Sequence, residues 1–168
     1  MKQVLLGCAV CLAAAVAVTF AAPDPDAVLG QWYTAGKESK VEITKEDGKY
    51  FGALVWLKDP LVEEGKPDAG KPKLDVNNPD PAHKNDPILG LKLLKGFSFD
   101  GKENWSGGTI YDPESGKTYK CTMKLSNNDT LDVRGYLGIA AFGRTTQWSR
   151  VPKEEESKPG ESADKPTK

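Results

Sequence analysis

The residue types that most often carry catalysis are scarce in this chain of 168 residues. His83 is the single histidine, and Asp80 and Asp86 lie near it in sequence, so a histidine general base is one chemistry to consider. No serine stands in the strand-to-helix elbow of a hydrolase, and Cys121 lies in an apolar run. We expect an exposed His83, a structural Cys121 and no enzymatic activity, and a hydrolase using His83 is the weakest alternative.

Oxygen ligands gather between residues 75 and 86, which could indicate a calcium site. Asp75, Asn77, Asp80 and Asp86 are the hard donors that calcium prefers. In the register of a calcium-binding EF-hand loop, however, Asp80 occupies the position that needs glycine, and no glutamate closes the loop. We therefore interpret the segment as structural turns and expect no metal and no cofactor.

Aromatic and cationic residues in the predicted strands are better candidates for a binding site. An arginine beside tyrosine and tryptophan would suit an amphipathic ligand with an anionic head. The predicted ligand-binding residues are Trp56, Tyr111, Arg134, Tyr136 and Arg144.

Strand alternation leaves the direction of two of these side chains open. In residues 130–137, Arg134 and Tyr136 share one face, and Leu131, Val133, Gly135 and Leu137 share the other. If the apolar face fills the interior, Arg134 and Tyr136 face solvent instead of a pocket.

The elements that must position these residues are short strands. Residues 105–112, 117–125, 130–137 and 144–151 are rich in β-branched and aromatic side chains, and turn residues separate the first three. This spacing is typical of an antiparallel meander.

Further strands are predicted upstream of the meander. Asp47-Gly48 joins two strand-like runs and predicts a hairpin in which Ile43 pairs with Gly52 and Val41 with Leu54. Val41, Ile43, Leu54 and Trp56 would then share one face. A strand in residues 28–34, and one in the second half of 88–97 that pairs with 106–111, bring the total to eight or nine. Antiparallel sheets of this size usually close, so we predict an all-β, small antiparallel up-and-down barrel.

Residues 59–87 interrupt the strand pattern. Six prolines fall in this segment, a density that no central strand can hold. A loop of this length in a compact domain is usually functional or packed by its own side chains. We expect one long proline-rich loop beside the mouth of the barrel.

The two ends of the sequence differ from the predicted barrel domain, residues 27–151. Residues 1–22 combine a short basic start, an apolar run and small residues before Pro23, which indicates a cleaved signal peptide and a periplasmic or secreted protein. Residues 152–168 are charged and almost free of apolar side chains, so we expect a disordered tail. The formal net charge is −1 and no basic stripe occurs, which argues against nucleic-acid binding.

Two tryptophan motifs resemble the pattern of calycins, the lipocalins and related barrels. Gly30 stands two residues before Trp32 in the first strand, and Trp148 stands two residues before Arg150 in the last. The resemblance implies that an arginine, Arg150 or alternatively Arg144, packs over the Trp32 indole and seals one barrel end. Gly30, Trp32, Trp148 and Arg150 are therefore the predicted structural residues.

The chain also resembles an uncharacterised family of secreted bacterial proteins, a domain of unknown function. The matching motifs are Gly30-Gln31-Trp32, residues 75–81, 87–91, 107–119 and 131–136, and Gly143 to Arg150. Where the family tends to show leucine and arginines after residue 81, this chain has His83, Lys84 and Asp86. The resemblance implies a calycin-type barrel in the cell envelope and brings no known activity.

Together these observations favour a non-enzymatic barrel that binds a small hydrophobic or amphipathic ligand. The alternative is a ligand-free barrel that docks to an envelope protein through the proline-rich loop. In neither case do we expect a stable membrane span in the mature protein.

Overall fold

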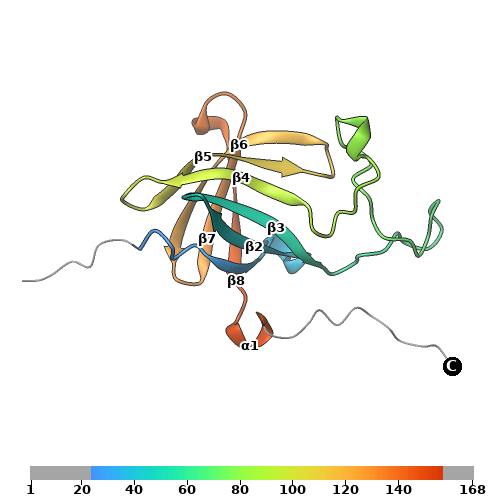
Figure 1. Cartoon of the computed structure of the whole chain (residues 1–168), viewed down its shortest axis with the longest axis horizontal. Coiled ribbons are helices and arrows are strands. Elements are labelled where there is room, and N and C mark those ends of the chain that lie inside the picture. Colours follow the sequence, from blue (N-terminus) through green and yellow to red (C-terminus); the bar gives the residue numbers. More distant parts are fainter. Residues whose placement is uncertain (1–23, 157–168) are drawn as a thin grey trace, which may run out of the picture.

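The computed structural model describes residues 24–156, which form one closed antiparallel barrel of eight strands (Figure 1). Each strand pairs with its sequence neighbours, and β1 also pairs with β8. The strands are β1 (Gly30–Tyr33), β2 (Ser39–Glu46), β3 (Lys49–Leu57), β4 (Lys92–Phe99), β5 (Asn104–Asp112), β6 (Lys117–Asn127), β7 (Thr130–Tyr136) and β8 (Arg144–Arg150). The predicted all-β up-and-down barrel is thereby confirmed, with eight strands.

The β2–β3 hairpin has the predicted register. Ile43 pairs with Gly52 and Val41 with Leu54, and the left-handed backbone at Asp47 and Gly48 (φ 49° and 75°) makes the tight turn. Beyond Leu54 the register shifts, so that Lys40 lies opposite Trp56 and Val55 is an extra residue. Because of this bulge, Trp56 leaves the face that it was predicted to share with Leu54.

The barrel has two unlike ends, which we call the closed end and the open end. The closed end carries residues 24–29 and the β2–β3, β4–β5 and β6–β7 turns. The open end carries the β1–β2 connection with the 3-10 turn η1 (Ala35–Lys37), residues 58–91, the β5–β6 turn and the β7–β8 connection with the 3-10 turn η3 (Ala140–Phe142).

The closed half of the barrel is packed with large apolar side chains. Inward positions alternate along each strand, as in Leu131 and Val133 of β7 and Cys121 and Met123 of β6. The largest of the fully buried side chains are Trp32, Trp105, Tyr50, Phe97, Ile43, Leu94, Met123 and Leu131. These residues fill the interior, so this half leaves no room for a ligand.

The described residues before β1 and after β8 both contact the barrel, which moves the expected domain limits. The Trp105 indole N–H donates to Pro25 O (3.0 Å) and the Tyr50 hydroxyl to Asp26 Oδ1 (2.8 Å), so the folded unit begins before residue 27. The expected tail is ordered at its start, because α1 (Lys153–Glu156) follows Val151 and Tyr33 Oη donates to Glu155 Oε2 (2.8 Å). The predicted signal peptide and residues 157–168 lie outside the described residues.

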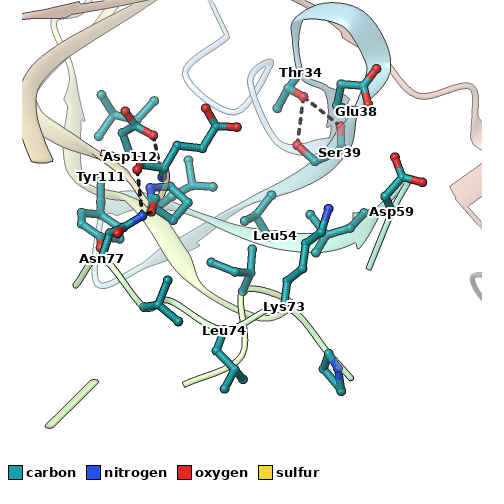
Figure 2. Close-up of a pocket in the computed structure, with 18 of the residues that line it drawn as sticks. Thr34, Glu38, Ser39, Leu54, Asp59, Lys73, Leu74, Asn77, Tyr111 and Asp112 are labelled. Atoms are coloured by element: carbon teal, nitrogen blue, oxygen red, sulfur yellow. Dashed lines mark hydrogen bonds between the residues drawn. The ribbon is translucent and has the colours of Figure 1, made fainter. Parts of the chain in front are cut away.

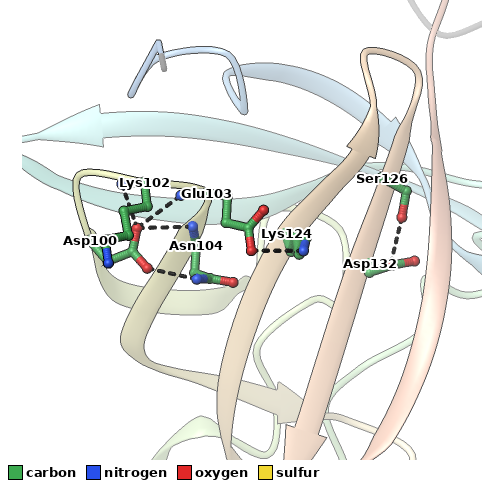
Figure 3. Close-up of polar contacts among 7 residues, drawn as sticks. All are labelled: Asp100, Lys102, Glu103, Asn104, Lys124, Ser126 and Asp132. Carbon is green, nitrogen blue, oxygen red and sulfur yellow. Dashed lines mark hydrogen bonds and ion pairs between the residues drawn. The ribbon is translucent and has the colours of Figure 1, made fainter. Parts of the chain in front are cut away.

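The β4–β5 turn shows how the closed end is fastened (Figure 3). The Asp100 carboxylate accepts hydrogen bonds from the backbone N–H groups of Lys102, Glu103 and Asn104 and from the Asn104 side chain. The Asn104 side chain and these N–H groups hold the pKa of Asp100 well below its usual range. A short turn thus joins β4 to β5.

The proline-rich segment, residues 59–87, extends from the open end (green in Figure 1). It is held by isolated bridges, Leu61 with Pro72 and Leu74 with Pro87. It also contains the 3-10 turn η2 (Pro81–His83), in which the Ala82 N–H donates to the Asp80 side chain. Within residues 24–156, no helix is long and apolar enough to cross a membrane.

Candidate ligand-binding site

A cavity of about 1420 Å³ opens between the open end of the barrel and the proline-rich segment (Figure 2). In Figure 2, Tyr111 and Asn77 lie on one side of it, Thr34 and Ser39 on the other, and Leu54 between them. At the closed end, by contrast, a depression of about 160 Å³ lies beside Trp105. The larger cavity is the candidate site, since drug-sized ligands occupy several hundred cubic ångströms.

The floor of the cavity is the upper surface of the packed core. Leu54, Leu93, Val133 and Trp148 line it and are at most 6% exposed, because the same side chains pack downward on the core. Above them the wall continues with Ile110, Tyr119, Gly135 and Thr146. The inner part of the cavity is therefore mainly apolar, and ionisable groups stand around its rim.

Gly135 leaves open space in this wall. A Cβ atom placed on Gly135 would meet Ile110 at 3.5 Å and Tyr119 at 3.6 Å, which are ordinary contacts. The backbone of Gly135 is in a conformation that other residues adopt. A Cβ atom at this position is therefore sterically allowed, and a side chain that continues from it would extend along the cavity wall.

A buried carboxylate fixes the proline-rich segment to the barrel. Asp75 is fully buried, and it accepts hydrogen bonds from the Tyr111 hydroxyl (2.8 Å) and the Asn78 side-chain amide (2.7 Å). Burial and the bond to Asp75 raise the pKa of Tyr111 to about 12. Tyr111 is thus a protonated donor that joins β5 to the loop across one side of the cavity.

A second contact fixes the same loop to the β5–β6 turn. The Asn77 side-chain amide donates to Pro113 O (3.3 Å) and Glu114 O (2.8 Å). The Asn77 carbonyl oxygen would lie only 2.0 Å from a Cβ atom on Gly116, which has a φ of +68°. Only glycine fits there, so two motifs that are 36 or more residues apart in sequence interlock. We call these contacts of Asp75 and Asn77 the latch.

The structure brings two of the five predicted ligand-binding residues to the cavity. Tyr111 lines it from β5, and Arg144 lines it from the start of β8 on the same strand face as Thr146 and Trp148. Arg144 is exposed at the rim and Tyr111 is partly buried.

The structure places the other three predicted residues outside this cavity. Trp56 faces outward after the β3 bulge and packs edge-on against Tyr33, with ring centroids 6.1 Å apart. Arg134 and Tyr136 lie on the outer face of β7, because Leu131 and Val133 point inward. Arg134 donates instead to Ala140 O, Ala141 O and Thr145 Oγ1.

The predicted structural residues surround the packed core. The Arg150 guanidinium lies 4.1 Å from the centroid of the Trp32 ring, and it donates to Ala27 O, Leu29 O and Asn128 O at 2.7–2.9 Å. Gly30, with a φ of +105°, lets β1 begin beside this guanidinium. Arg150, and not Arg144, is therefore the arginine over Trp32, and Trp148 lies one layer higher in the cavity floor.

The residues considered for catalysis or metal binding have structural partners. His83 Nδ1 lies 2.7 Å from Asp86 Oδ2, and this hydrogen bond raises the pKa of the exposed histidine. Burial raises the pKa of the Cys121 thiol to about 12, so it is a poor nucleophile. Among residues 24–156 there is no cluster of three or more histidine, cysteine or acidic side chains that could hold a metal ion.

Sequence reasoning missed the latch and most of the cavity wall. Asp75 had been weighed as a calcium ligand, but its tyrosine partner is 36 residues away and no local pattern marks it. Gly135 did carry a signal, since a glycine inside a strand often marks a site where another group comes close.

This chain matches a known protein family. A family described as "Uncharacterized protein conserved in bacteria (DUF2147)" matches residues 30–150. The chain belongs to this family. The uncharacterised bacterial family expected from the motifs is thereby confirmed.

A solved structure supports the fold at the same time. The protein HP1028 from Helicobacter pylori, described as belonging to the lipocalin family, is 27% identical over 76% of this chain and 85% of its own, with a TM-score of 0.63. No curated protein matches the chain. The barrel is therefore lipocalin-like, as the tryptophan motifs implied.

Proposed function

We propose that this protein is a non-enzymatic carrier of a small amphipathic ligand, which binds in the cavity at the open end. The observation that carries the proposal is the half-filled barrel: a packed core below, and above it an apolar wall open to solvent. The lipocalin-like fold agrees with such a role. From the apolar run in residues 4–20, we further propose that the protein acts in the periplasm or outside the cell.

The lining predicts how the ligand lies. Its apolar part rests on Leu54, Leu93 and Val133, and its polar head stays at the rim near Arg144. Arg144 favours an anionic head group, although Asp112 and Glu114 share the rim and limit the number of negative charges that the site accepts.

Two fluorescent probes test this arrangement. 1-Anilinonaphthalene-8-sulfonate is apolar and anionic, and N-phenyl-1-naphthylamine is apolar and neutral; both should gain emission on binding. Gly135→Leu should reduce the gain for both probes, and the control Thr122→Leu, on the outer face of β6 opposite Arg134, should leave it unchanged. Arg144→Gln should lower the affinity for the anionic probe by about threefold, because the residue is exposed, and should leave the affinity for the neutral probe unchanged. Equal probe binding by wild type and Gly135→Leu would refute the cavity as the site.

One alternative has support of its own, docking to an envelope protein through the proline-rich segment. Leu61 and Val76 of this segment are 48% and 60% exposed and could contact a partner protein. If this alternative holds, the protein should bind neither probe. Changing both Leu61 and Val76 to serine should abolish binding of the partner protein. Probe binding that depends on Gly135 would favour the carrier instead.

A further inference from the structure

The most exposed apolar side chains of the described chain lie in the connection between β7 and β8. Phe142 is 82% exposed, Leu137 65% and Ile139 64%. Residues 137–143 carry no charge, and Ala140 and Ala141 between these side chains are exposed as well. We call this segment the apolar finger; in Figure 1 it is the orange loop at the top of the barrel, on the opposite side from α1.

The finger has a defined shape. Arg134 Nε and Nη2 donate to Ala140 O at 3.0 and 2.7 Å, and Nη2 also reaches Ala141 O at 3.2 Å. Within the finger, Phe142 N–H donates to Ile139 O (3.2 Å) and Gly143 N–H to Ala140 O (3.0 Å). These bonds hold the backbone of residues 139–143, while the apolar side chains remain exposed. In the alternative with the apolar face of residues 130–137 inward, Leu137 would fill the interior, but it does not. The strand β7 ends at Tyr136, and Gly138, with a φ of +73°, turns the chain outward.

Basic residues stand around the base of the finger. Arg134 and Arg144 flank it in sequence, and Lys120 of β6 pairs with Tyr136, the last residue of β7. The 3-10 turn that ends at Lys37 packs against β8. Acidic groups are present at this end as well: Glu38 pairs with Lys58, and Asp112 and Glu114 share the cavity rim with Arg144. Asp132, lower on β7, accepts from Ser126 and Gln147. An apolar tip with a cationic base is the pattern of a segment that inserts into an anionic lipid surface.

We propose that the apolar finger docks the open end of the barrel on an anionic bilayer. Phe142, Ile139 and Leu137 enter the acyl layer, and the basic residues stay at the level of the lipid phosphates. Since Arg144 belongs both to the finger base and to the cavity rim, docking would bring the cavity mouth to the membrane surface. The proposal does not depend on what the cavity binds.

Co-sedimentation with vesicles tests the docking. Full-length protein should sediment with vesicles of phosphatidylglycerol and phosphatidylethanolamine, and much less with vesicles of phosphatidylcholine. Phe142→Asp should reduce the apparent affinity roughly tenfold or more, as expected for losing one buried aromatic side chain. The matched control is Val55→Asp, at a 37% exposed apolar residue of β3, which should bind as wild type does. Lys120→Gln should weaken binding to the anionic vesicles and reduce its dependence on salt.

Other outcomes would overturn the proposal. These are failure of the wild type to sediment with anionic vesicles, or an equal loss in Phe142→Asp and Val55→Asp. Self-association that Phe142→Asp abolishes, without vesicle binding, would show that the finger contacts a second copy instead. The membrane proposal and the carrier function can be tested separately. Phe142→Asp should bind the fluorescent probes as wild type does, and Gly135→Leu should bind vesicles as wild type does.

Discussion

The two ends of this barrel use the same strands and have opposite properties. At the closed end, residues 24–29, an arginine stacked on Trp32 and a set of buried aromatic rings pack together, and a small surface depression lies beside Trp105. At the open end, the strands continue around a cavity, and a long segment is fastened beside it by a few polar contacts. The difference shows how a lipocalin-like barrel can place its stability at one end and its candidate site at the other.

The largest expected effect comes from the closed end. Trp32→Ala removes a fully buried indole, its hydrogen bond to Val28 O and its contact with Arg150, and should lower the free energy of unfolding by about 3–5 kcal/mol. Thr146→Ala, in the cavity wall, should cost less than about 1 kcal/mol. Urea denaturation followed by circular dichroism measures both. If the two variants lose similar amounts of stability, the closed end does not contribute more to the stability of the barrel than the open end.

A smaller effect is expected at the latch. Gly116→Ala combines a left-handed backbone with a 2.0 Å clash against Asn77 O, whereas Gly101→Ala has the backbone cost alone, with a φ of +82° and no atom within 4 Å. Gly101→Ala should lower the free energy of unfolding by about 1–2 kcal/mol, and Gly116→Ala should lower it by at least about 1 kcal/mol more. Hydrogen exchange should show the additional loss in the proline-rich segment. If both variants lose equal stability and keep the same exchange pattern, the latch does not hold the segment.

A smaller effect is expected from the Tyr111–Asp75 hydrogen bond. Tyr111→Phe, which removes it, should lower the free energy of unfolding by about 1 kcal/mol. Its pH dependence has a definite sign. The pKa of Tyr111 is raised to about 12 in the folded protein, against an ordinary value of 10.0, so the bond contributes fully below pH 10 and is lost as the pH rises toward 12. Ultraviolet absorbance of tyrosinate should show one hydroxyl that ionises near pH 12, absent in Tyr111→Phe. Ionisation near pH 10 would mean that Tyr111 is not held by Asp75.

The smallest expected effect concerns Cys121, which reports on the packed half. Burial raises the pKa of its thiol to about 12, so it should not react with a disulfide reagent at pH 8 while the barrel is folded. Labelling should become rapid only in denaturant, with the same midpoint as unfolding. Rapid reaction of the native protein would show that the inner half opens more easily than its packing indicates.

The fold could be predicted from sequence because its signals are local. Asp47-Gly48 set the β2–β3 register, and turn residues marked the later strands. The site could be predicted only in part, since strand alternation gives two faces without saying which is inward. One extra residue, Val55, then reversed the direction of Trp56. The Tyr111–Asp75 bond spans 36 residues and depends on how the loop returns to the barrel, which no local pattern encodes.

Native mass spectrometry of the protein, purified without detergent from the cells that produce it, tests the half-filled barrel as a carrier most directly. We expect an additional mass on the order of a few hundred daltons, as for a ligand that fills such a cavity, and its loss on denaturation. The additional mass should be absent in Gly135→Leu and present in Thr122→Leu. A bare polypeptide mass in the wild type, unchanged after incubation with a lipid extract, would contradict the carrier function.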